Sequence, residues 1–141
     1  MKKKLESIRV EYNSKSINYN NLLANPIDQL KLWMNDAINA NIKDANAVIL
    51  STYDNKKGIQ SRVVLIKQIN EIGLVFYTNF DSVKGFQMSN NKHVSLCFFW
   101  SNIERQVRIN GLVKKVSERD SDAYWALRPK DSKISAIFFN F

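Results

Sequence analysis

From Ala47 onward, short apolar segments are separated by turn-forming residues, and this spacing constrains the fold more than any other feature of the chain. Segments of this kind cover residues 47–53, 60–68, 74–78, 93–100 and 105–116. Strands this short, joined by tight loops, predict an antiparallel meander. The loop between the first two segments ends in Gly58, which can adopt the positive φ that a hairpin loop needs.

Helices are predicted on both sides of these strands. Asn25 can cap a helix that begins at Pro26, and Asp28 suits the positive end of its dipole. Its apolar residues follow helical spacing and predict one stripe that packs into the core: Ile27, Leu30, Met34, Ala37 and Ile38. A further helix is predicted to about Asn90, with either Asp81 or Ser82 as its cap, and another from Ser117 to about Leu127.

This order of elements indicates a mainly β protein with flanking helices, of the α+β class, built on a small closed or nearly closed antiparallel barrel. A length of 141 residues predicts one domain, which we assign to residues 21–141. Residues 1–20 are polar and lack a periodic apolar pattern, so we predict a mobile N-terminal arm there.

The composition excludes several classes of protein. Hydrophobic residues make up 45% of the chain, yet no apolar run approaches the roughly 20 residues of a membrane helix, and the N-terminus does not read as a secretory signal. Cys97 is the only cysteine and His93 the only histidine, which excludes an intrachain disulfide and a Cys/His-rich metal site. We interpret both as structural residues, and we expect a reducing, cytoplasmic setting.

The formal net charge of +8 favours an anionic partner: nucleic acid, anionic lipid or a phosphate-bearing small molecule. A protein that is merely rich in surface lysine has the same composition. The lysines are spread along the chain, at residues 2–4, 56–57, 114–115 and 130 among others, so no dense block marks a nucleic-acid surface. Neither a nucleic acid nor a membrane is therefore expected as a partner.

The segment Arg62-Val-Val-Leu-Ile-Lys67 places a basic residue at each end of four apolar residues. Four consecutive apolar residues indicate a strand covered on both faces. The side-chain period of two puts Arg62 and Lys67 on opposite faces unless a bulge intervenes. Two interpretations remain open: charges at the ends of a buried strand, or cations at either end of a bound cofactor.

Ser82-Val-Lys84 opens the short helix predicted over residues 81–90, directly after Tyr77-Thr78. Free N–H groups, a hydroxyl and a lysine at a helix N-terminus can bind a phosphate. The alternative is an ordinary serine cap beside a solvated lysine.

The segment 105–116 alternates between polar and apolar residues, so one face of the predicted strand is polar. The polar residues are Glu104, Gln106, Arg108 and Asn110. Such a face points to solvent, to a cavity or to a subunit interface. The Gln106 amide could offer both a donor and an acceptor to the edge of a planar heterocycle.

Tyr124, Arg128 and Ser132 recur at intervals of four residues. Pro129 interrupts a helix there, so a turn has to bring Ser132 round. Arg128 offers a planar fork to a phosphate, and the two hydroxyls can donate to it. Alternatively, Tyr124 is a core aromatic residue and Arg128 interacts with a helix C-terminus.

In this order, over about residues 5–137, these motifs resemble the pyridoxine (pyridoxamine) 5′-phosphate oxidases, which are FMN-binding split barrels. The resemblance implies a set of residues that contact FMN: Arg62, Val63, Leu65, Lys67, Tyr77, Thr78, Ser82, Lys84 and Gln106. It also implies a set that contacts the substrate: Lys67, Tyr124, Arg128, Ser132, Arg9 and Tyr12. No metal ligand and no catalytic side chain are predicted, because in this family the flavin carries out the chemistry.

The resemblance implies a flavoprotein oxidoreductase that converts pyridoxamine or pyridoxine 5′-phosphate to pyridoxal 5′-phosphate. Molecular O2 is the electron acceptor. The family works as a homodimer, with each site at the interface and built from both subunits.

Two departures from the family pattern stand out. Val83 occupies a position where the family usually has an arginine, and the printed sequence ends at Phe141, without the several tens of residues with which the family completes its site. We therefore expect impaired turnover. Two alternatives remain: a non-catalytic FMN-binding or cofactor-free remnant, and a basic nucleic-acid-binding barrel.

Overall fold

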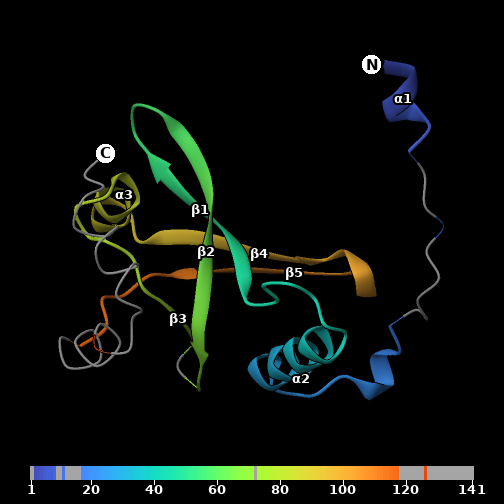
Figure 1. The fold of residues 1–141 in the computed structure, drawn as a ribbon. Coiled ribbons are helices and arrows are strands. Elements are labelled where there is room, and N and C mark those ends of the chain that lie inside the picture. Colours follow the sequence, from blue (N-terminus) through green and yellow to red (C-terminus); the bar gives the residue numbers. More distant parts are fainter. Residues whose placement is uncertain (1, 9–10, 12–16, 72, 118–125, 127–141) are drawn as a thin grey trace.

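The computed structural model describes residues 2–8, 11, 17–71, 73–117 and 126 of the chain. Its centre is one antiparallel sheet with the strand order β3-β2-β1-β4-β5 (Figure 1). The strands are β1 Ala47–Asp54, β2 Gly58–Ile69, β3 Leu74–Phe76, β4 His93–Trp100 and β5 Arg105–Leu112. The helices are α1 Lys2–Glu6, α2 Pro26–Asn39 and α3 Val83–Asn90, with 3-10 turns at Tyr19–Asn21 and Ser101–Ile103. The predicted antiparallel, mainly β architecture is confirmed.

All five predicted strands are present, but two end earlier than predicted. β5 ends at Leu112 rather than at residue 116, because Leu112 already pairs with His93, the first residue of β4. β3 ends at Phe76 rather than at residue 78, because the chain then turns at Asn79, whose side chain accepts a hydrogen bond from the Asp81 N–H group. The predicted helix over residues 117–127 lies almost entirely outside the described residues.

The N-terminal region contains more local structure than its sequence pattern predicted. α1 and the 3-10 turn at Tyr19–Asn21 both fall within residues 1–20 or at their boundary. Neither element has a buried residue among those whose side chains are described. The mobility of this arm stays a prediction.

Helix α2 begins as its local sequence predicted. The Asn25 side chain accepts a hydrogen bond from the Ile27 N–H group, and Pro26 occupies the first turn. Ile38 was wrongly included in the buried stripe: it is 55% exposed. The helical rotation of about 100° per residue turns it away from the direction of Leu30, Met34 and Ala37, which are buried.

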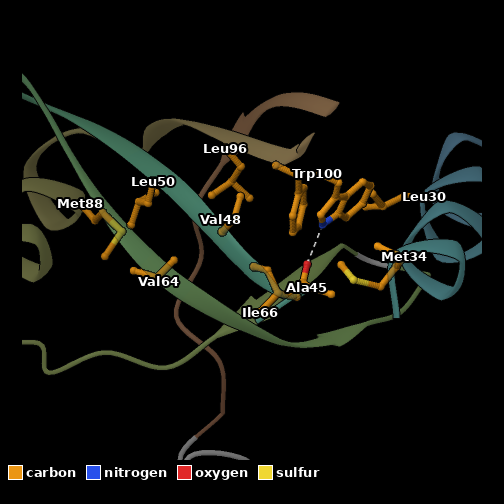
Figure 2. Packing of buried hydrophobic residues seen from close by; sticks show 12 residues of the cluster. Leu30, Met34, Ala45, Val48, Leu50, Val64, Ile66, Met88, Leu96 and Trp100 are labelled. Carbon is orange, nitrogen blue, oxygen red and sulfur yellow. Dashed lines mark hydrogen bonds between the residues drawn. The ribbon is translucent and has the colours of Figure 1, made fainter. Parts of the chain in front are cut away.

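The core lies on one face of the sheet, here called the inner face. Even-numbered residues of β1, of β4 and of β2 as far as Ile66 point into it, together with the odd-numbered residues of β5. Figure 2 shows Met88 of α3 at one end of this core and Leu30 and Met34 of α2 at the other. Trp100 lies near α2 and donates its indole N–H group to the Ala45 carbonyl over 2.8 Å.

The opposite, outer face is uncovered in the described part of this single chain. Val63 is 64% exposed and Leu65 40% exposed, and Ile49 and Phe99 are exposed beside them on β1 and β4. The prediction that residues 63–66 form a strand covered on both faces is therefore wrong for the single chain. Consecutive apolar residues indicated burial, but only Val64 and Ile66 point into the core.

Candidate functional site

A polar cluster interrupts the inner face near the start of α3. Its centre is Arg62 of β2, whose guanidinium donates from Nη1 to the Thr52 hydroxyl over 2.6 Å and from Nη2 to Oε1 of Gln87 over 3.0 Å. A third, longer hydrogen bond of 3.3 Å reaches the Leu50 carbonyl. Thr52 on β1 and Gln87 on α3 are themselves hydrogen-bonded over 2.6 Å, so the cluster joins two strands to the helix.

Lys84, in the first turn of α3, adds a second cation to this cluster. Burial lowers the pKa of Lys84, and the positive charge of Arg62 lowers it further. Burial also lowers the pKa of Arg62. Ion pairs among the described residues join Lys31 to Asp28 and Arg105 to Asp36, so neither cation of the cluster has a carboxylate partner there. Two partly buried like charges without a counter-ion favour the binding of an anion.

The loop before α3 is held close to the helix. Ser82 caps α3 through the Gly85 N–H group, as its sequence predicted, and donates its own proton to the Asn79 carbonyl over 2.6 Å. Gly85 makes the close approach possible, because a Cβ atom at this position would lie 2.2 Å from the Phe80 carbonyl oxygen. The helix N-terminus and its positive dipole therefore lie directly behind this loop.

Thr78 lies in the same loop and has an unusual hydroxyl. Its Oγ1 atom is buried and has no hydrogen-bond partner within the described part of the chain. A buried hydroxyl left unpaired costs about 1–3 kcal/mol. A ligand with a hydrogen-bond acceptor, bound beside the loop that precedes α3, would satisfy this hydroxyl.

Within the described part of the chain, the donors that these hydrogen bonds leave over suit a phosphate. A guanidinium has five N–H groups, and Arg62 uses three of them in the hydrogen bonds above, which leaves two. The Lys84 ammonium has three and donates one to Ser82 Oγ over 3.2 Å, which also leaves two. The Ser82 proton is already used, so Arg62, Lys84 and Thr78 are better placed to bind an anion than Ser82 is.

The remaining predicted FMN-contacting residues of the sheet lie on a different face from Arg62. Val63, Leu65 and Gln106 point to the outer face, opposite to Arg62. Gln106 pairs with Phe99 and is separated from β2 by β1 and β4. The residues of one chain are therefore not brought together around one ligand.

Lys67 lies where the pairing of β2 with β3 is irregular. The register shifts between Ile66 and Gln68, which is the bulge that the sequence argument allowed for. Lys67 is exposed and lines a hollow beside the end of α2, together with Ile38 and Ile69. Tyr77 follows β3 and lines a separate hollow that also contains Lys114 and Lys115.

The predicted substrate-contacting residues other than Lys67 lie outside the described residues: Arg9, Tyr12, Tyr124, Arg128 and Ser132. Within the described part of the chain, no group of three or more His, Cys, Asp or Glu side chains is arranged to hold a metal ion. The described residues also contain no helix with both the length and the apolarity that crossing a bilayer requires.

Sequence reasoning missed Thr52 and Gln87, although both lie at the centre of the polar cluster. A threonine in a strand and a glutamine in a helix carry no local signal of function. The inward position of Thr52 could have been inferred from its even number, which it shares with the core residues Val48 and Leu50. The partnership of Thr52 with Gln87 spans 35 residues and required the tertiary structure.

A curled antiparallel sheet of five strands, with a cationic cluster beside a short helix, places this chain among the split-barrel proteins. A solved structure of PhzG from Burkholderia lata 383, in complex with tetrahydrophenazine-1-carboxylic acid, matches the fold with a TM-score of 0.84 at 24% identity, over 91% of this chain and 63% of that one. A pyridoxamine 5′-phosphate oxidase-related, FMN-binding protein from Nostoc punctiforme PCC 73102 matches with a TM-score of 0.64 at 18% identity, over 81% of this chain and 63% of that one.

The sequence profile of the family described as pyridoxamine 5′-phosphate oxidase matches residues 34–140, and the chain belongs to this family. A pyridoxine/pyridoxamine 5′-phosphate oxidase from Cytophaga hutchinsonii is 44% identical over 136 residues, and one from Haemophilus influenzae is 41% identical over 132 residues. These alignments cover 96% and 94% of this chain but 63% of each relative, so the chain spans less than two thirds of their length. The relatives do not favour a nucleic-acid-binding barrel.

Proposed function

We propose that the chain binds FMN and that Arg62, Lys84 and Thr78 hold its phosphate at the start of α3. One observation carries this proposal, and it concerns the described residues. There, two partly buried cations have no carboxylate partner, and they lie at the helix that follows the loop with the Thr78 hydroxyl, which has no hydrogen-bond partner among the same residues. The fit is chemical as well as electrostatic. A phosphate can accept the two N–H groups that each cation has left, and a further hydrogen bond from Thr78.

The reaction that we propose is that of the relatives: oxidation of pyridoxamine or pyridoxine 5′-phosphate to pyridoxal 5′-phosphate with O2 as the acceptor. FMN supplies the redox chemistry when bound. The side chains of the protein hold and orient the two phosphorylated molecules. Arg62 and Lys84 act at the cofactor phosphate, and Lys67 is proposed to contact both cofactor and substrate. Tyr124, Arg128 and Ser132, with Arg9 and Tyr12, are proposed for the substrate phosphate and its cover.

We further propose that the protein acts as a homodimer whose outer sheet faces take part in the contact. The exposed apolar side chains of Val63, Leu65, Ile49 and Phe99 lie together on that face, and burying them stabilises association. Within one chain, Gln106 and Arg62 point to opposite faces of the sheet. A site that uses both residues therefore needs Gln106 from a second copy. We propose a cytoplasmic location for this enzyme.

FMN titration of the purified 141-residue chain tests this function. Quenching of flavin fluorescence should report saturable binding, with FMN bound more tightly than riboflavin, because only FMN carries the phosphate. An Arg62→Lys/Lys84→Met double variant should lose that preference, whereas Lys92→Met, an exposed lysine after α3, should keep it. Equal affinities of the wild type for FMN and riboflavin would contradict the phosphate site. Formation of pyridoxal 5′-phosphate and hydrogen peroxide at saturating FMN then tests the reaction separately.

A further inference from the structure

We propose that Thr52 and Gln87 are positioning residues, which orient the Arg62 guanidinium beside Lys84 so that its free N–H groups are available to a phosphate. The proposal rests on the FMN-phosphate site proposed above and assigns a role to two residues that do not themselves contact the ligand. Thr52 is 2% exposed and Gln87 is 1% exposed, so their polar groups are buried with Arg62 as their shared partner.

The directions of the hydrogen bonds in this cluster are determined by its atoms. Oε1 of Gln87 carries no proton, so it accepts from both the Thr52 hydroxyl and Nη2 of Arg62. Thr52 has given its only proton to Gln87 and can only accept the bond from Nη1. The Nε2 amide of Gln87 donates to Gln60 Oε1, which determines the orientation of the Gln87 amide. One arrangement of donors therefore holds the guanidinium in place.

The chemistry of this support preserves the charge of Arg62. A carboxylate in place of Gln87 would hold the guanidinium equally firmly but would neutralise it and compete with a phosphate. Neutral oxygen acceptors orient the arginine and leave its charge, and that of Lys84, to the ligand. This explains why the side chains that accept hydrogen bonds from Arg62 within the described part of the chain are an uncharged amide and a hydroxyl.

A second interpretation is purely structural: the cluster ties α3 to β1 and β2. Both interpretations predict a loss of stability on substitution, so stability alone cannot separate them. They differ in the comparison of two ligands. A structural tie affects FMN and riboflavin alike, whereas a positioning role affects FMN only, because riboflavin lacks the phosphate that Arg62 would bind.

The experiment measures the dissociation constants of FMN and riboflavin for near-isosteric variants. Thr52→Val and Gln87→Met should each weaken FMN roughly tenfold, in line with one charged hydrogen bond losing its orientation, and leave riboflavin within about twofold. Gln87→Glu should weaken FMN further, because it introduces a competing carboxylate. Thr52→Ser retains the hydroxyl and should restore the wild-type ratio.

Gln29→Met is the matched control. Gln29 of α2 is also buried and accepts a hydrogen bond, from the Leu23 N–H group over 2.8 Å, so its loss should lower the melting temperature without changing the FMN-to-riboflavin ratio. A parallel loss of both ligands in Thr52→Val and Gln87→Met, or no loss of FMN, would overturn the positioning role. A wild type without preference for FMN would overturn the phosphate site itself, together with this inference. If Gln87→Met does not fold, the pair Thr52→Val and Thr52→Ser decides the question by the same ratio.

Discussion

Replacing Val83 by arginine should tighten FMN binding and slightly destabilise the ligand-free protein. Val83 is the first residue of α3, immediately before Lys84, and is 50% exposed, so a longer side chain can extend into solvent. The new guanidinium would lie at the same helix N-terminus as the proposed phosphate. Riboflavin affinity should not change, because the added charge acts on the phosphate alone.

The magnitude follows from two opposing terms. A hydrogen bond to a charged group contributes about 1.5–3 kcal/mol. Ordering a flexible side chain costs about 0.5–1.5 kcal/mol. The midpoints leave about 1.3 kcal/mol, which corresponds to roughly eightfold tighter binding. In the ligand-free protein, a cation at the positive end of the helix dipole should lower the free energy of unfolding by about 0.3–1 kcal/mol.

Fluorescence titration with FMN and riboflavin, combined with urea unfolding in the absence of flavin, measures both effects in one protein preparation. Val83→Gln is the control, since it adds a polar side chain of moderate length without charge. The reasoning is refuted if the arginine variant binds both flavins more tightly by the same factor, or if its FMN affinity does not differ from that of Val83→Gln.

Three further predictions concern the loop, the pH dependence and the outer face. Gly85→Ala should lower the free energy of unfolding by about 1–3 kcal/mol, because the new Cβ atom would overlap the Phe80 carbonyl. Urea denaturation measures this change, provided that the dependence of the unfolding free energy on urea concentration stays the same. An unchanged free energy of unfolding would contradict the close approach of Gly85 to Phe80. The preference for FMN over riboflavin should fall as pH rises through the lowered pKa of Lys84, because the ammonium loses its proton there, and Lys84→Arg should move this fall to higher pH. Without ligand, the partly buried Lys84 charge lowers the free energy of unfolding at pH values below that pKa. The contribution of Lys84 to the free energy of unfolding should therefore rise with pH over the same window. Val63→Asp should shift the protein from dimer to monomer in sedimentation at micromolar concentration. Leu32→Asp, at an exposed position on α2, is the control and should leave the dimer intact. A dimer that persists in Val63→Asp would exclude this part of the outer face as the contact.

Local sequence chemistry was sufficient to predict the five strands and the helices α2 and α3, but not α1 or the two 3-10 turns. Asn25 followed by Pro26 predicted the start of α2, Ser82 predicted the cap of α3, and Gly58, with φ of 70°, predicted the first hairpin. These signals act within a few residues of the chain, through cap hydrogen bonds and permitted φ angles, and do not depend on the surrounding structure. The antiparallel class followed from the short strands and the tight loops that join them, which are also visible in the local sequence.

The proposed phosphate site, in contrast, was only partly predictable. The motifs that resemble the family named Arg62, Thr78 and Lys84. They did not indicate that the Thr78 hydroxyl has no partner among the described residues, or that Arg62 lowers the pKa of Lys84. The partners of Arg62 lie 10 and 25 residues away, and strand register and the packing of α3 bring them to it. Register also decided that Gln106 and Arg62 point to opposite faces. Which side chains share a face and a neighbourhood depends on contacts between distant segments, and only the tertiary structure determines those.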